Sequence, residues 1–213
     1  MSAEKLQGFF ESTAGQITVV AVIVIIFILI LISGKNKKTD TKALVTCAVL
    51  TALAVALGAI TLFRMPQGGS ITPFSMVPIV LAGYFYGVRR GVMVGMVVGL
   101  INLIFNPYVI HPMQLLLDYP IAFGALGLGA IFRNREKIGL AAAYLFGLLC
   151  RYICAVLSGV IFFGAYAPEG FSALTWSLWY NLTYLAVEGA ASVIILSIPV
   201  VHTTFDRLKL QTV

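Results

Sequence analysis

Long apolar runs recur along the whole chain and leave few folds open to it. A transmembrane helix needs about 20 mostly apolar residues to cross the roughly 30 Å hydrocarbon core of a bilayer. Seven runs approach that length, at residues 17–33, 43–63, 71–88, 91–105, 113–132, 138–163 and 173–201. The strands of a membrane barrel alternate apolar and polar residues, and these runs do not. The sequence therefore predicts an all-α integral membrane protein.

The composition supports this prediction. Hydrophobic residues make up 60% of the 213 residues, charged residues make up 10%, and the mean hydropathy is +1.00. Soluble domains carry about 25% charged residues, so a soluble globular protein is excluded. The net charge of +6 comes from basic residues between the apolar runs and not from one face of a domain. We therefore expect a lipid bilayer, and no nucleic acid, as a partner.

The basic residues are distributed unevenly among the loops. If the loop 34–42 is cytoplasmic and the spans alternate, eleven of the fourteen lysines and arginines lie on the cytoplasmic side. Positively charged loops are typically the cytoplasmic ones. The first run is followed and not preceded by lysines, which predicts a retained helix and not a secretory signal. We expect a multi-pass plasma-membrane protein with its N-terminus outside and its C-terminus in the cytoplasm.

Sequence motifs of common enzyme classes are missing. There is no G-x-x-x-x-G-K-[ST] phosphate loop and no H-E-x-x-H zinc pair. His111 and His202 are expected on opposite sides of the membrane, and the three cysteines lie within apolar runs. We therefore expect no enzyme, no metal site and no cofactor, and active transport would need an energy source from another subunit.

Three ionisable residues lie within the predicted spans: Asp118, Arg151 and Glu188. Each charge costs about 2.5–3.5 kcal/mol at a helix centre on insertion scales, so each needs a partner, a cavity or a ligand. Arg151 and Glu188 are expected at similar depth on consecutive helices, which favours an ion pair, with a ligand role for Arg151 as the alternative. Asp118 lies about 7 Å below the outer end of its span, with nothing basic at its level. This favours a cationic or hydrogen-bond-donating ligand.

The last run carries a polar aromatic stripe. Its members recur every four residues with one amide beside them: Trp176, Tyr180, Tyr184, Glu188 and Asn181. Residues four apart share one face of a helix. Because Asn181 would lack a partner against lipid, the stripe favours a pocket. Since the polarity stops near the midplane, it favours a blind pocket over a pore.

Two outer segments are predicted to be irregular. Residues 65–70 read Met-Pro-Gln-Gly-Gly-Ser, and Pro73 and Pro78 follow them. Proline interrupts helices, so the beginning of the run 71–88 is not expected to be continuous helix. Residues 106–112 form a second proline-containing loop. Both a lid over a pocket and an ordinary connection are compatible with these segments.

Several blocks resemble one known family. They read GGSIT (68–72) with SMVPI (75–79), LDYPIAF (117–123) with GLG (127–129), SGVIFFG (158–164) with YAPEG (166–170), and WSLWYN (176–181). Their order and loop positions match as well, over about residues 43–200. In these blocks the chain resembles the thiamine-specific S components (ThiT/YuaJ family) of energy-coupling factor (ECF) transporters.

The resemblance implies a six-helix membrane domain, at residues 43–213, that binds thiamine in an outward-facing pocket. Residues 1–42 would add an N-terminal transmembrane helix and a basic cytoplasmic loop. The domain would dock on a transmembrane coupling subunit driven by two ATPases. The implied docking face consists of Ala48, Ala52 and Ala56, whose four-residue spacing lets a partner helix approach closely.

The resemblance also implies ligand-binding positions, which we combine with the aromatic stripe. The expected thiamine site consists of Asp118, Tyr119, Arg151, Gly159, Phe163, Trp176, Tyr180 and Asn181. Ala155 stands where the family often has histidine, and Phe163 where some members have tryptophan. These departures leave room for a related pyrimidine or thiazole ligand. The alternatives are an S component for another vitamin, or a structural or channel protein in which Asp118 and the stripe pack helices.

Overall fold

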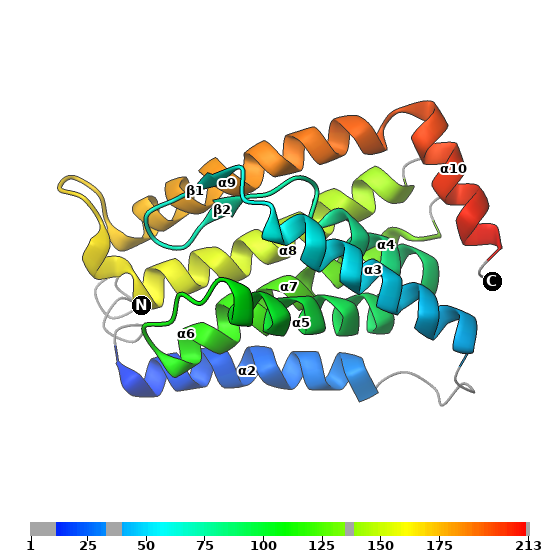
Figure 1. Ribbon diagram of the computed structural model, residues 1–213. Coiled ribbons are helices and arrows are strands. Elements are labelled where there is room, and N and C mark those ends of the chain that lie inside the picture. The colour runs from blue at the N-terminus through cyan, green and yellow to red at the C-terminus, as the bar shows by residue number, and fades with distance from the viewer. Residues whose placement is uncertain (1–11, 33–39, 135–138, 212–213) are drawn as a thin grey trace.

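The computed structural model describes residues 12–32, 40–134 and 139–211, and its elements are almost all helices (Figure 1). The first half contains α2 (Thr13–Ile32), α3 (Thr41–Ala59), β1 (Phe63–Arg64), β2 (Ser70–Ile71), α4 (Val77–Tyr86) and α5 (Val88–Phe105). The second half contains α6 (Pro112–Leu116), η1 (Leu117–Ile121), α7 (Ala122–Ala125), η2 (Leu126–Phe132), α8 (Gly139–Phe162), η3 (Gly164–Tyr166), α9 (Ala173–Leu196) and α10 (Pro199–Leu210).

Six of the described helical segments are long and apolar enough to cross a membrane, and the ten-residue α4 is a shorter apolar helix. The predicted all-α membrane fold is therefore confirmed. The short hairpin β1–β2 and η3 lie at one end of the bundle, and α10 lies at the other (Figure 1). We call these the hairpin end and the α10 end. The basic loop predicted at 34–42 lies mostly outside the described residues.

Prolines account for the places where the helices differ from the predicted runs. The run 71–88 becomes helical only at Val77, because Pro73 has no N–H to donate and the residues before it form β2. Pro120 lies inside η1, a π-helical stretch that interrupts the run 113–132. In the last run, α9 ends at Leu196 and Pro199 begins the separate helix α10.

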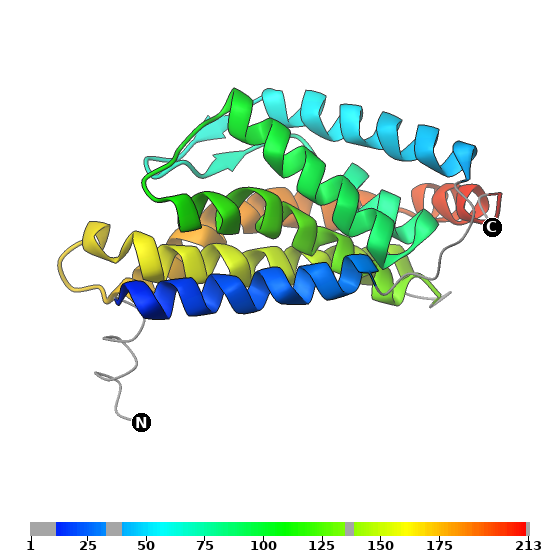
Figure 2. The same ribbon diagram turned by 90° about the horizontal axis from the view of Figure 1, so that it is seen from below.

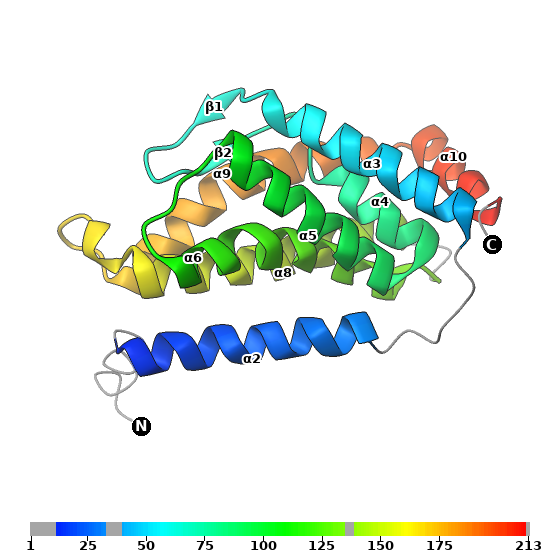
Figure 3. The ribbon, with the colours of Figure 1, turned by 60° about the horizontal axis from the view of Figure 1, so that its bottom comes forward.

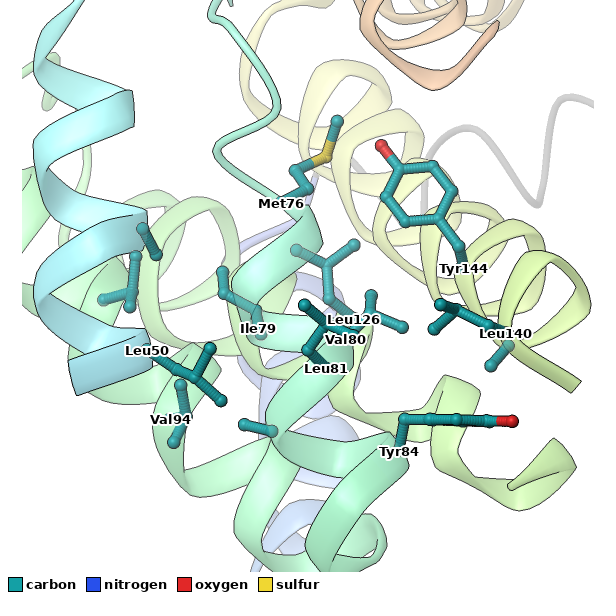
Figure 4. Packing of buried hydrophobic residues seen from close by; sticks show 14 of the residues in the cluster. Leu50, Met76, Ile79, Val80, Leu81, Tyr84, Val94, Leu126, Leu140 and Tyr144 are labelled. Carbon is teal, nitrogen blue, oxygen red and sulfur yellow. The ribbon is translucent and has the colours of Figure 1, made fainter. Parts of the chain in front are cut away.

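The centre of the bundle is α4, in which every residue from Pro78 to Phe85 is buried. Side chains from α3, α5, η2 and α8 pack around it (Figure 4): Leu50, Val94, Leu126, Leu140 and Tyr144. In a bilayer such packing stabilises through close van der Waals contact, since lipid chains are as apolar as leucine.

Glycines let α5 approach η1 and α7 closely. Gly95 and Gly99 lie on one face of α5, four residues apart. A Cβ on either one would overlap the backbone carbonyl of Phe123 or of Tyr119. This close approach fixes the position of η1, the segment that carries Asp118.

The additional helix α2 runs along one side of the bundle, with α3 on the opposite side (Figures 2 and 3). It packs against α5, α6 and η1. Val20 and Phe27 are its buried apolar side chains among the described ones, and the ring of Phe27 lies against Gly124. Most other described side chains of α2 are exposed, as expected for a helix that faces lipid.

Candidate functional site

A cavity of about 900 Å³, counted with the open space at its mouth, lies between α8, α9, η1 and two loops at the hairpin end. Its lining includes all eight residues predicted for the ligand site: Asp118, Tyr119, Arg151, Gly159, Phe163, Trp176, Tyr180 and Asn181. The structure thus brings together side chains from three separate parts of the sequence. Their role in binding stays a prediction.

Asp118 reaches the cavity from the π-helical segment η1. Its Oδ2 accepts a 2.6 Å hydrogen bond from Nε2 of Gln114, which is 1% exposed. The same Nε2 also donates to the carbonyl oxygen of Tyr108, at 3.1 Å. Within the described part of the chain, Asp118 forms no ion pair. The carboxylate is therefore held in place by a neutral amide and is available to a ligand.

Arg151 and Glu188 do not form the predicted ion pair, so that prediction is wrong. The Arg151 guanidinium lies 3.9 Å from the centre of the Phe123 ring, and its Nη1 is buried without a hydrogen-bond partner. Glu188 instead accepts hydrogen bonds from Thr72, Ser75 and Met76. These donors belong to the segment that precedes α4. The spacing of polar residues along α9 does not predict them. Arg151 lines the cavity, and the alternative role considered for it, in ligand binding, stays a prediction.

The aromatic stripe of α9 forms one wall of the cavity. The ring centres of Trp176 and Tyr180, and those of Tyr180 and Tyr184, are 5.9 Å apart. The Tyr184 hydroxyl donates to Oδ1 of Asn181, at 2.8 Å. Nδ2 of Asn181 donates to the carbonyl oxygen of Ser177, at 2.9 Å. The wall therefore presents aromatic rings and one amide fixed by its neighbours.

The loop of the β1–β2 hairpin lies against this wall. Backbone N–H groups of Gln67 and Gly69 donate to the hydroxyl of Tyr180, at 3.1 and 3.0 Å. Nε1 of Trp176 donates to Oε1 of Gln67, at 3.3 Å. A Cβ on Gly69 would lie 2.9 Å from the Tyr184 ring, so only glycine fits the loop this close to the wall. The hairpin thus covers part of the cavity mouth.

The loop 106–111 covers another part of the mouth. The Tyr119 hydroxyl accepts from the backbone N–H of Tyr108, at 2.7 Å, and donates to the carbonyl oxygen of Asn106, at 2.9 Å. The Tyr108 ring stacks on Phe163, with ring centres 5.9 Å apart. Nη2 of Arg64 in β1 donates to Oδ1 of Asn106, at 2.8 Å, and so connects the two loops.

Another wall of the cavity contains small residues where α8 meets α9. A Cβ on Gly159 would overlap Oγ of Ser177, so this glycine permits close helix packing as well as a smooth wall. The Ser177 hydroxyl donates to the carbonyl oxygen of Val156, at 2.9 Å. Ser158 beside them is buried and also lines the cavity. Its hydroxyl adds a polar group to this wall.

The polar groups of this site that sequence reasoning missed include Gln67, Tyr108 and Gln114. Gln114 precedes Asp118 by four residues, which is the helical spacing for a side-chain hydrogen bond and was the available signal. Gln67 and Tyr108 lie in loops, where no periodicity predicts which side chains face a cavity.

The alanines of the predicted docking face are all exposed on α3: Ala48, Ala52 and Ala56. α3 packs on α4 and α5 with its other side. Large apolar side chains flank the alanines and are exposed as well, including Val49 at 60% and Leu53 at 46%. The described structure thus leaves this small-residue face uncovered, and its docking role stays a prediction.

Comparison with known proteins gives consistent results. The model of a family described as "Thiamine transporter protein (Thia_YuaJ)" matches residues 44–207. The chain is 36% identical over 165 residues to the thiamine transporter ThiT of Bacillus subtilis, covering 70% of this chain and 85% of that protein. It is 31% identical over 156 residues to ThiT of Lacticaseibacillus paracasei, covering 65% and 76%. The solved structure of ThiT from Listeria monocytogenes is similar with a TM-score of 0.63 and 26% identity, covering 75% of this chain and 95% of that one.

Proposed function

The chain belongs to the Thia_YuaJ family of thiamine transporter proteins, and from this premise we propose that it captures thiamine in the cavity at its hairpin end. It is a transporter subunit and not an enzyme. The observation that supports the proposal best is that one carboxylate, several aromatic faces and several side-chain amides converge on a single cavity. Thiamine combines a positively charged thiazolium ring with an aminopyrimidine. The carboxylate suits the cation, and the aromatic faces and amides suit the rings and the pyrimidine nitrogens.

Each group of the cavity has a distinct task in this proposal. Asp118 supplies a negative charge for the thiazolium cation, and exclusion of water by the ligand strengthens that attraction. Phe163 and Trp176 offer faces for ring stacking and cation–π contact. Asn181 both donates and accepts, which suits the nitrogens of the pyrimidine. The unpartnered Nη1 of Arg151 adds a further donor near the midplane.

The test is a titration of purified protein with thiamine, followed by quenching of tryptophan fluorescence. Trp179 is 61% exposed, so Trp179→Phe leaves Trp176 in the cavity wall as the reporter. Asp118→Asn should weaken binding at least about tenfold, or about 1.4 kcal/mol. Glu169→Gln, which changes an exposed carboxylate in the η3–α9 connection, is the matched control and should bind as the parent does.

Two results would contradict the proposal at different levels. Unchanged affinity in Asp118→Asn would show that the carboxylate does not contribute to binding, while thiamine would remain the proposed ligand. Absence of saturable binding in the parent would show that thiamine is not the ligand. Because Ala155 and Phe163 depart from the family pattern, the titration should include the separate pyrimidine and thiazole moieties as competitors. Tighter binding of either moiety than of thiamine would favour the related-ligand alternative.

We further propose that the chain is the S component of an ECF transporter. In this arrangement the face Ala48, Ala52 and Ala56 of α3 docks on a transmembrane coupling subunit, and two ATPases supply the energy for release. The uncovered small-residue face supports docking, because small side chains let two helices approach closely. The hairpin end would face outward, with the N-terminus outside and α10 at the cytoplasmic side. Arg133, Arg207 and Lys209 at the α10 end agree with this orientation.

A further inference from the structure

Glu188 lies in α9 and is 5% exposed, so its charge must be compensated within the protein. Its Oε2 accepts from the backbone N–H of Thr72, at 3.3 Å, and from Oγ1 of Thr72, at 2.7 Å. Its Oε1 accepts from Oγ of Ser75, at 3.2 Å, and from the backbone N–H of Met76, at 3.3 Å. Both oxygens therefore bind one short segment, residues 72–76, which we call the carboxylate turn.

The carboxylate turn contains a strained residue. Phe74 has a φ of +61°, in the left-handed region that bulky residues rarely adopt. Backbone hydrogen bonds from Phe74 N–H to the Thr72 carbonyl and from Val77 N–H to the Phe74 carbonyl tighten the turn further, at 3.1 Å each. Such conformations persist only where the surroundings enforce them. The four hydrogen bonds to Glu188 flank Phe74 on both sides, since they reach Thr72 before it and Ser75 and Met76 after it.

The carboxylate turn is directly connected to the hairpin that covers the cavity. It begins at Thr72, immediately after β2. The hairpin loop is bonded to the Tyr180 hydroxyl, and Tyr180 lies on the same face of α9 as Glu188, eight residues earlier. α9 therefore holds this segment at two points, the tip through Tyr180 and the base through Glu188.

A second cavity, of about 510 Å³ with its open space, adjoins the carboxylate turn. Its lining includes Thr72, Ser75, Met76 and Glu188 on one side, and Gly58 of α3 on another. The turn therefore borders empty space on this side and is not packed all round.

From these contacts we infer that Glu188 is a positioning residue for the ligand site. Its carboxylate holds the strained turn and thereby keeps the hairpin closed over the cavity, without touching the ligand. This inference rests on the proposed function, because it assigns to Glu188 an effect on how long thiamine stays bound.

The decisive measurement is the dissociation rate of thiamine, followed by recovery of Trp176 fluorescence. In Glu188→Gln one oxygen becomes an NH₂ group, which faces a donor on the turn and leaves a backbone N–H without an acceptor. We expect dissociation at least about tenfold faster, with the association rate changed much less. Ser192→Ala is the matched control. Ser192 lies one turn further along α9, is fully buried and forms none of the hydrogen bonds to the carboxylate turn, so dissociation should be unchanged.

A second variant separates positioning from general stability. Phe74→Gly removes the cost of the positive φ, because glycine adopts this region freely. In the Glu188→Gln background it should restore part of the slow dissociation, since a relaxed turn needs less support. Hydrogen exchange of residues 65–76 should rise in Glu188→Gln and fall again in the double variant. Thr72→Val removes only the hydroxyl donor and should raise the dissociation rate about threefold. It replaces Glu188→Gln as the test if that variant does not fold.

Unchanged dissociation in Glu188→Gln or, where that variant does not fold, in Thr72→Val would overturn the inference. A faster dissociation that Phe74→Gly does not slow would also overturn it, because the effect would then not act through the turn. Failure of the proposed function is distinguishable, since the parent would then show no saturable thiamine binding. The hydrogen exchange of the hairpin still tests the role of Glu188 in that case, without any ligand.

Discussion

Gly99→Ala tests whether the packing of α5 on η1 sets the position of the ligand site. Gly99 lies in α5, and a Cβ there would overlap the backbone carbonyl of Tyr119. That carbonyl is backbone, so a side-chain rotation cannot relieve the overlap. The two segments must move apart, and η1 carries Asp118 next to Tyr119. We therefore expect the single methyl group to change both stability and thiamine binding.

Two opposing terms determine the size of the effect. Inserting a methyl group into a well-packed interior costs about 1–3 kcal/mol. Replacing glycine by alanine within a helix contributes about 0.5–1 kcal/mol in the other direction. Gly58→Ala in α3 isolates the second term, because a Cβ there would lie 3.8 Å from Cβ of Ser75, an ordinary contact. Gly99→Ala should thus be destabilising and Gly58→Ala neutral or slightly stabilising.

The assay is thermal unfolding in detergent, with and without thiamine, together with the fluorescence titration. For a chain of this length 1 kcal/mol corresponds to about 2–4 °C in Tm, so Gly99→Ala should unfold several degrees below Gly58→Ala. Its thiamine affinity should fall about three- to tenfold, or about 0.7–1.4 kcal/mol, through displacement of Asp118. Equal Tm values in the two variants would refute the packing argument. A lower Tm with unchanged affinity would refute the connection between this contact and the site.

Two further predictions concern the faces of α3 and α2. Ala52→Trp should abolish uptake in cells and leave thiamine binding by the purified protein intact, because the bulky ring keeps a partner helix away. Ala190→Trp, at an exposed alanine of α9, is its control, and equal loss of uptake and binding in Ala52→Trp would contradict docking at α3. Phe27→Ala should lower Tm by several degrees, because it removes a buried ring from the contact between α2 and Gly124, and truncating a buried phenylalanine costs up to about 3–5 kcal/mol in a soluble core. Ile28→Ala, which truncates a side chain that is 49% exposed, should leave Tm within about 1 °C of the parent, and an equal loss in both variants would show that α2 has no specific contact with the bundle.

The membrane fold could be predicted from the sequence because its main constraint is local. A bilayer satisfies no backbone hydrogen bonds, so an apolar run of sufficient length has to form a helix. The differences arise where a run contains proline. Pro120 removes one N–H from the helical ladder, and the chain adopts the π-helical η1 instead of a continuous α-helix. Apolarity alone carries no signal for that change.

The candidate site could be predicted in part, and the reason differs from residue to residue. Trp176, Tyr180 and Asn181 follow from helical spacing, which is a local pattern. The partners of Glu188 come from residues 112 to 116 positions away, in a turn whose geometry depends on a positive φ at Phe74. Depth along a helix suggested Arg151 as the partner, but similar depth on two helices does not show that two side chains face each other. Rotation about the helix axis decided the outcome, and the carboxylate turn provided the donors.

The position of α2 bears on the proposed docking of the chain. The family match begins at residue 44, so α2 lies outside the matched region. A helix added to a transport subunit can either cover a partner surface or avoid it. Here α2 packs on α5, α6 and η1, on the side of the bundle opposite α3 (Figure 3). It therefore supports the segment that carries Asp118 from behind and leaves the small-residue face of α3 uncovered. An added helix in this place is compatible with both capture of a ligand in the cavity and docking through α3.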